Sequence, residues 1–161
     1  MPEAPSGSLR AAVITGWLVA GTLDIAVAVV YYPLTSAVTP IGILRGIASG
    51  VLGPRAFTGG VATAALGLAC HYGIALIWTA WFFLIYPRIG FLSRSTLLTA
   101  VLYGTFVSAV MRFVVLPLSR VAQRPFDLKF FVIATVILMF SIGLPLAVVA
   151  GRYYARRAPR G

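Results

Sequence analysis

The chain has 161 residues, of which 60% are hydrophobic and only 10% are charged, and its mean hydropathy is +0.99. Soluble domains carry about 25% charged residues, so this composition excludes a water-soluble globular domain and predicts an integral membrane protein. The net charge of +10 does not indicate nucleic-acid binding, because the Lys and Arg residues are spread between apolar stretches without a basic, aromatic-rich face. We interpret them as topology signals and as contacts to anionic lipid headgroups.

The apolar stretches predict an all-α, polytopic membrane protein in which residues 1–161 form one domain, a bundle of four transmembrane helices. The first span covers about 11–32, and Pro33 is expected to end it. The segment 40–52 follows, with Thr39 as N-cap and Pro40 at the first helical position. Its apolar residues fall on one face, which predicts a short amphipathic helix at the membrane interface.

The other three spans cover about 57–86, 95–118 and 128–153. The second span would be about 45 Å long against a hydrocarbon core of about 30 Å, so we expect it to tilt or protrude. Ser93 or Ser95 can cap the third span, and Asp127 can cap the fourth. Pro145 is expected to kink the fourth helix.

Three ionisable residues, Asp24, His71 and Arg112, lie inside spans, and each follows small residues at four-residue spacing. A charge at the bilayer centre costs about 2.5 kcal/mol or more, so such groups normally face the protein interior. Small residues let membrane helices approach closely. The pattern therefore predicts one buried polar centre that a solute or proton could use. The small residues expected at helix contacts are Gly16, Ala20, Gly59, Thr63, Gly67, Ala100, Gly104, Ser108, Gly143 and Ala147.

Asp24 and Arg112 would lie about 20 and 25 Å from the same boundary if both helices run in one direction. Their opposite charges then predict an ion pair. Snorkelling of Arg112 to the headgroups is the alternative, and Asp24 could instead be protonated in an apolar pocket. His71 is expected to be a hydrogen-bonded core residue, with proton transfer or haem ligation as alternatives. Bis-histidine haem would require a homodimer, because the chain has one His.

The sequence predicts no enzyme, no metal site and no cofactor. It holds three acidic residues, one of them Glu3 near the N-terminus, and Cys70 is the only cysteine. Phosphate-binding loops, paired catalytic carboxylates and clustered metal ligands are absent from the sequence.

The distribution of basic residues favours both termini in the cytoplasm. The N-terminal tail, the second loop and the C-terminal tail hold seven, namely Arg10, Arg88, Arg94, Arg152, Arg156, Arg157 and Arg160. The first and third loops hold five, namely Arg45, Arg55, Arg120, Arg124 and Lys129.

Three segments resemble a family of uncharacterised bacterial four-helix membrane proteins. They are the run Ile43-Leu-Arg-Gly-Ile-Ala-Ser-Gly-Val-Leu-Gly53, the stretch from Gly59-Gly60 to His71, and Val114-Val-Leu-Pro-Leu-Ser119. The resemblance covers most of the chain. It implies four spans in a bacterial inner membrane, and it implies no activity, because that family has none assigned.

We expect a small permease-like or channel-like protein in which Asp24, His71 and Arg112 line or gate a path. A homo-oligomer would fit this function, because four helices leave little room for a path. The alternative is a structural or accessory subunit of a membrane complex, in which the same residues serve assembly. A water-filled cavity that reaches Asp24 would favour the path, and a dry bundle would favour the alternative.

Overall fold

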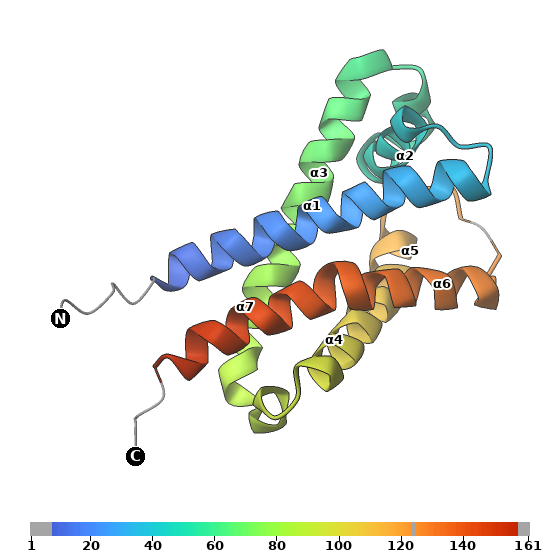
Figure 1. The fold of residues 1–161 in the computed structure, drawn as a ribbon. Coiled ribbons are helices and arrows are strands. Elements are labelled where there is room, and N and C mark those ends of the chain that lie inside the picture. The colour runs from blue at the N-terminus through green and yellow to red at the C-terminus, as the bar shows by residue number, and fades with distance from the viewer. Residues whose placement is uncertain (1–7, 124, 158–161) are drawn as a thin grey trace.

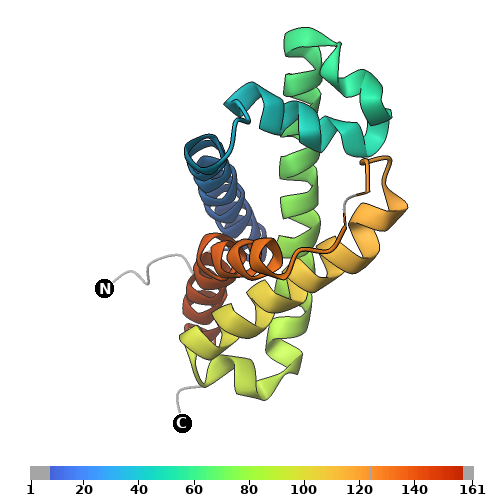
Figure 2. The same cartoon turned by 90° about the vertical axis from the view of Figure 1, so that its right-hand side faces the viewer.

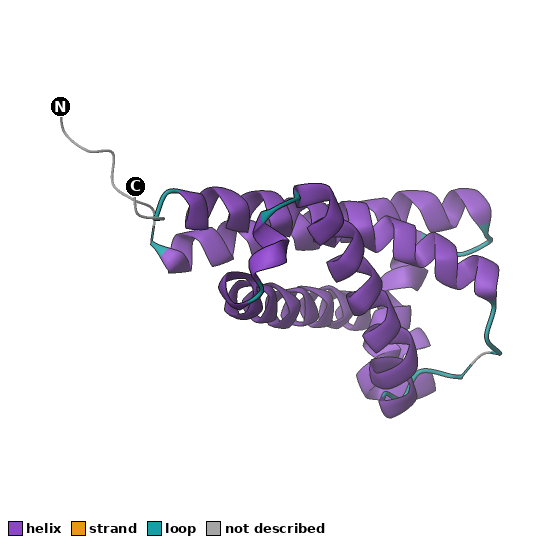
Figure 3. Cartoon of the chain, turned by 90° about the horizontal axis from the view of Figure 1, so that it is seen from below, coloured by secondary structure: helices purple, strands orange, loops and turns teal. Residues whose placement is uncertain are grey.

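The computed structural model describes residues 8–123 and 125–157, so the predictions that involve Glu3, Arg124 and Arg160 lie outside the described residues. Within that part the elements are helices joined by loops, with no strand (Figure 3). Four helical segments are long and apolar enough to cross a membrane, namely Leu9–Thr35, Gly60–Arg88, Thr96–Leu118 and Leu128–Ala155. The predicted fold class, an all-α protein with four apolar helices, is confirmed.

Helix α1 (Leu9–Thr35) begins at Ser8, whose side chain accepts a hydrogen bond from the N–H of Ala11. The prediction that Pro33 ends this helix is wrong, because Pro33 lies inside it. The missing N–H of Pro33 does not prevent the bonds of later residues, and the N–H of Ser36 still donates to the carbonyl of Tyr32. The helix therefore continues past the proline.

Helix α2 (Pro40–Leu52) begins as predicted, with the Thr39 side chain accepting from the N–H of Gly42. It ends at Gly53, whose φ of 62° favours glycine, and the 3₁₀ turn η1 (Gly53–Phe57) follows. Helix α2 lies across the first half of α3 (Figure 2). Its position at a membrane interface stays a prediction.

Helix α3 (Gly60–Ile85) begins three residues later than the predicted span, because η1 and the Gly59–Gly60 turn occupy the intervening positions. Gly60 has φ 65°, a conformation that glycine adopts without steric cost. The 3₁₀ turns η2 (Tyr86–Arg88) and η3 (Gly90–Ser93) then lead to the next span. Figure 1 shows α3 crossing α1 steeply, as a strongly tilted helix would.

The third and fourth spans have the same internal design. The third consists of α4 (Thr96–Val110), the π turn η4 (Met111–Val115) and α5 (Leu116–Leu118). The fourth consists of α6 (Leu128–Leu138), the π turn η5 (Met139–Gly143) and α7 (Leu144–Ala155). The predicted N-caps Ser95 and Asp127 both accept hydrogen bonds from backbone N–H groups in the first turn of their helices.

Each π turn covers the start of a Met-x4-Leu-Pro-Leu sequence. Pro145 has no N–H to donate, and its ring would collide with the carbonyl of Ser141 four residues earlier. The backbone widens instead, and the N–H of Leu144 bonds to the carbonyl of Met139, five residues back. The expected distortion at Pro145 is therefore a π turn.

Helices α1 and α6–α7 lie side by side and run in opposite directions (Figure 1). The beginning of α1 and the end of α7 meet at one end of the molecule, where Ala11 and Arg152 line a common pocket. The core contains the fully buried Phe82 and Leu146. Large apolar side chains are exposed on the outer surface, as in a helix bundle that faces lipid.

Candidate functional site

Asp24 contacts the fourth span through a side-chain hydrogen bond. The Ser141 hydroxyl donates to Oδ1 of Asp24 over 2.7 Å. Ser141 is buried and lies in the π turn η5, whereas Asp24 is half-buried on α1. π turns are rare and are frequently found at functional sites. The carboxyl group of this apolar helix is thus held by a locally irregular part of the neighbouring helix.

His71 contacts α1 one helical turn before Asp24. Its Nε2 atom lies 2.8 Å from the carbonyl oxygen of Gly21. A carbonyl only accepts, so Nε2 carries the proton and Nδ1 is the proton acceptor of the neutral ring.

The hydrogen bonds of Asp24 and His71 meet α1 within one helical turn, and we call this part of the bundle the polar region. Gly21, the backbone partner of His71, and Asp24 are three residues apart and share a helix face. Trp17 Nε1 donates to the Tyr72 carbonyl over 2.7 Å, and the Tyr72 hydroxyl bonds to Thr22 over 2.8 Å. These bonds fix the orientation of His71 relative to α1.

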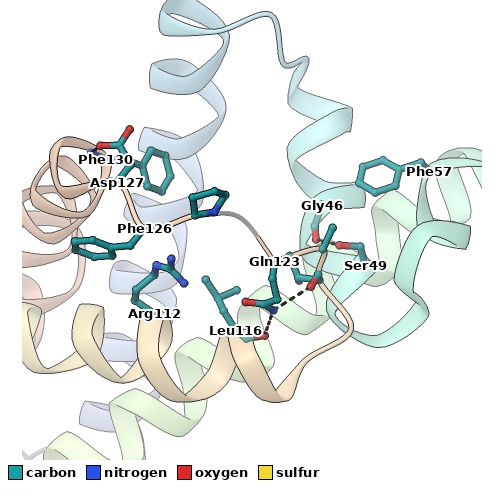
Figure 4. Close-up of a pocket in the computed structure, with 12 residues that line it drawn as sticks. Gly46, Ser49, Phe57, Arg112, Leu116, Gln123, Phe126, Asp127 and Phe130 are labelled. Atoms are coloured by element: carbon teal, nitrogen blue, oxygen red, sulfur yellow. Dashed lines mark hydrogen bonds between the residues drawn. The ribbon is translucent and has the colours of Figure 1, made fainter.

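Arg112 lies in a different place from the other two ionisable residues. It belongs to η4, and its guanidinium carbon is 5.6 Å from the centre of the Phe126 ring (Figure 4). Asp24 and Arg112 are both described by the structure and do not form the predicted ion pair, since Asp24 Oδ1 accepts from Ser141 instead. Equal depth in two helices does not bring side chains together, because the π turn and the inclined helices change which neighbour each one faces.

A pocket of about 460 Å³ opens between α1, α2 and α6. Its wall includes Tyr32, Thr35, Phe130 and Ile133. Tyr32 lines this pocket and follows Asp24 by eight residues on α1, or about 12 Å along the helix. The pocket therefore lies about two helical turns from Asp24, on the side of α2.

Most of the small residues expected at helix contacts lie at such contacts in the described residues. A Cβ atom on Gly67 would overlap the backbone carbonyl of Leu44, and one on Gly104 would come within 2.6 Å of the Met139 backbone nitrogen. The Ser108 hydroxyl bonds to Thr135 over 2.7 Å. Gly59 is the exception, because it is exposed and precedes α3. The remaining members are buried or half-buried, namely Gly16, Ala20, Thr63, Ala100, Gly143 and Ala147.

The sequence interpretation missed Ser141, Gly21 and Tyr72 as members of the polar region. Ser141 could have been noticed as a hydroxyl residue four positions before Pro145, where a helical carbonyl must lose its partner. No group of three His, Cys, Asp or Glu side chains that could hold a metal ion occurs in the described part of the chain.

Comparison of the chain with protein-family models, with curated proteins and with solved structures gives no match. The resemblance to bacterial four-helix membrane proteins therefore stays a prediction. The structure itself shows four apolar helices, whose length and composition are compatible with a multi-pass membrane protein.

Proposed function

We propose that the protein is a small permease-like membrane protein in which Asp24 and His71 bind and release protons. The observation that carries this proposal is the hydrogen bond from Ser141 to the half-buried Asp24 inside the bundle. An ionisable group in a transmembrane segment is costly to retain. Arg112, the nearest candidate for a neutralising charge in the sequence, contacts Phe126 instead.

Two further features support a proton route. In this proposal the pocket beside Tyr32 serves as the approach to Asp24 from the α2 side, since Tyr32 lines it and follows Asp24 on α1. Nε2 of His71 holds the ring on the Gly21 carbonyl, which leaves Nδ1 as the nitrogen that takes up a proton in this proposal. Protonation of the ring would add a positive charge near Asp24 and favour its ionised form.

The setting that we propose is a bacterial inner membrane, with both termini in the cytoplasm and several copies of the chain in one assembly. Its support is the charge bias of the loops and the adjacency of the two helix ends in one pocket. Fusion of a periplasm-active reporter to the C-terminus tests the orientation, and activity of that reporter would contradict it.

The test of the proton function is flux into liposomes. Purified protein is reconstituted with a trapped pH-sensitive dye, and a potassium diffusion gradient drives protons inward. The unchanged protein should acidify the lumen faster than protein-free vesicles do. Asp24→Asn should reduce this flux to the protein-free level, because the amide cannot carry the proton.

Asp127→Asn is the matched control, since it makes the same chemical change at the wall of the pocket beside Tyr32 and leaves Asp24 itself unchanged. Asn is as good an N-cap as Asp, so this variant should fold and keep its flux. The proposal fails if the unchanged protein moves no protons under either sign of the potential. It also fails if Asp24→Asn assembles normally and conducts as well as the control.

The competing function is that of a structural or accessory subunit. One observation favours it: Oδ1 of Asp24 already accepts from the buried Ser141 hydroxyl, as in a structural contact between two helices. In that case Asp24→Asn would reduce folding or assembly, and the unchanged protein would not raise proton flux.

A further inference from the structure

The largest pocket described here, about 560 Å³, lies away from the Asp24 region, at the end of the bundle where α2 is found. Its wall comes from α2, η1, the end of the third span and the loop that enters α6 (Figure 4). Arg112 lines this pocket together with the apolar side chains of Phe57, Leu116, Phe126 and Phe130. A cation thus meets a mainly apolar wall near the end of a membrane span.

The side chain of Arg112 is directed into this space. Arg112 precedes Leu118, the last residue of its span, by six residues, or about 9 Å of helix. In Figure 4 the guanidinium extends from η4 toward the pocket beside Phe126, and its carbon lies 5.6 Å from that ring's centre. Stacking on a ring uses the face of a guanidinium, whereas its N–H donors point outward in its plane.

We infer that this pocket binds the headgroup of an anionic phospholipid, with Arg112 bonding to the phosphate and the apolar wall contacting the glycerol and the upper acyl chains. Arginine is suited to a phosphate because its planar donors match two phosphate oxygens. Asp127 also lines the pocket, but its Oδ1 already accepts from the N–H of Phe130 at the start of α6.

The surroundings favour a lipid over free phosphate. The wall of the pocket is mainly apolar and open at one side. A small hydrated ion would leave this apolar wall uncovered, whereas an amphiphile would contact both Arg112 and the apolar side chains. Arg45, Arg55 and Arg120 lie on the segments that border the pocket. Such basic residues at a membrane surface attract anionic lipids.

The test is native mass spectrometry of the delipidated protein in detergent, titrated with dioleoyl phosphatidylglycerol, dioleoyl phosphatidylcholine or inorganic phosphate. Phosphatidylglycerol should bind as a discrete adduct, and phosphatidylcholine should bind at least about tenfold more weakly. Arg112→Gln should weaken phosphatidylglycerol binding by about tenfold or more, since hydrogen bonds to charged groups are the stronger ones. Arg94→Gln, which changes an exposed arginine between η3 and α4 that does not line the pocket, should leave it unaltered.

A second variant keeps the test valid if Arg112→Gln does not fold. Gly46 lines the pocket, and a Cβ atom on it would meet nothing within 4 Å, so Gly46→Leu should occupy the space without a clash. Gly73→Leu is its control, because Gly73 is also a helical glycine with open space around it, on α3. Gly46→Leu should lose the phosphatidylglycerol adduct, and Gly73→Leu should keep it.

Three outcomes would overturn the inference. The first is equal binding of the anionic and the zwitterionic lipid. The second is unchanged phosphatidylglycerol binding in both Arg112→Gln and Gly46→Leu. The third is displacement of the lipid by millimolar inorganic phosphate, which would assign the pocket to the free ion.

Discussion

The hydroxyl of Ser141 donates a 2.7 Å hydrogen bond to Asp24, and this bond joins the first span to the fourth across 117 positions of the sequence. The neighbours of Ser141 hold its π turn firmly. Gly104 of α4 lies against the backbone of Met139, and Gly143 lies against the carbonyl of Ala100. Asp24 is therefore positioned by a segment that is packed on its other side by α4.

The Asp24–Ser141 bond should appear as a coupling energy. We expect Ser141→Ala and Asp24→Asn to interact in a double-mutant cycle by about 0.6 kcal/mol and at most about 2 kcal/mol, the range of side-chain hydrogen bonds in membrane proteins. Unfolding in mixed detergent micelles measures the four stabilities. Additive effects of the two substitutions would show that this bond contributes nothing to stability.

Gly67 should be intolerant of any side chain. Gly67→Ala places a methyl group on the backbone carbonyl of Leu44, which can be relieved only if α2 moves away from α3. We expect a loss of about 1–3 kcal/mol, the usual cost of overpacking. Gly73→Ala in the same helix has open space and should gain up to about 1 kcal/mol from helix propensity. Equal effects of the two changes on unfolding in mixed micelles would contradict the close α2–α3 contact.

The contribution of Asp127 as the N-cap of the fourth span should be separable from the contribution of its charge. Asp127→Ala removes the acceptor for the Phe130 N–H and should cost about 1 kcal/mol. Asp127→Asn keeps an acceptor and should cost a few tenths of a kcal/mol or less. Denaturant titration followed by circular dichroism compares the two. A similar loss in both variants would mean that the carboxylate charge, and not the cap, matters there.

The local features of the fold were predictable because they depend on neighbours in the sequence. Thr39, Ser95 and Asp127 cap helices at the positions that their spacing indicates. The four apolar helices follow from hydropathy alone. The prediction that Pro33 ends the first helix was wrong because Pro33 lies in the last turn of α1, which ends at Thr35. A proline there removes one N–H donor and leaves the last turn intact.

The candidate site was only partly predictable. The cost of placing an ionisable group in the membrane draws attention to Asp24 and His71, but it does not identify their hydrogen-bond partners. Depth along a helix was expected to pair Asp24 with Arg112, yet depth fixes only the axial position of a side chain. The partner of a side chain depends also on which helix packs against its face, and hydropathy does not give that. Ser141 of the fourth span bonds to Asp24, and Arg112 lines the pocket near Phe126.

Cysteine labelling should reveal whether water reaches Asp24 from the pocket beside Tyr32. Cys70 is half-buried, so the experiment starts from a Cys70→Ser background. Ala28 lies between Asp24 and Tyr32 on the same face of α1 and is half-buried, whereas Ala26 is exposed on a different face. A thiol reacts as its thiolate, which forms in water and not in lipid. In liposomes, Ala28→Cys should therefore react with a charged maleimide and Ala26→Cys should not. Labelling of Ala26→Cys alone, or of neither variant, would mean that the helices are closed against water here and would favour the structural subunit.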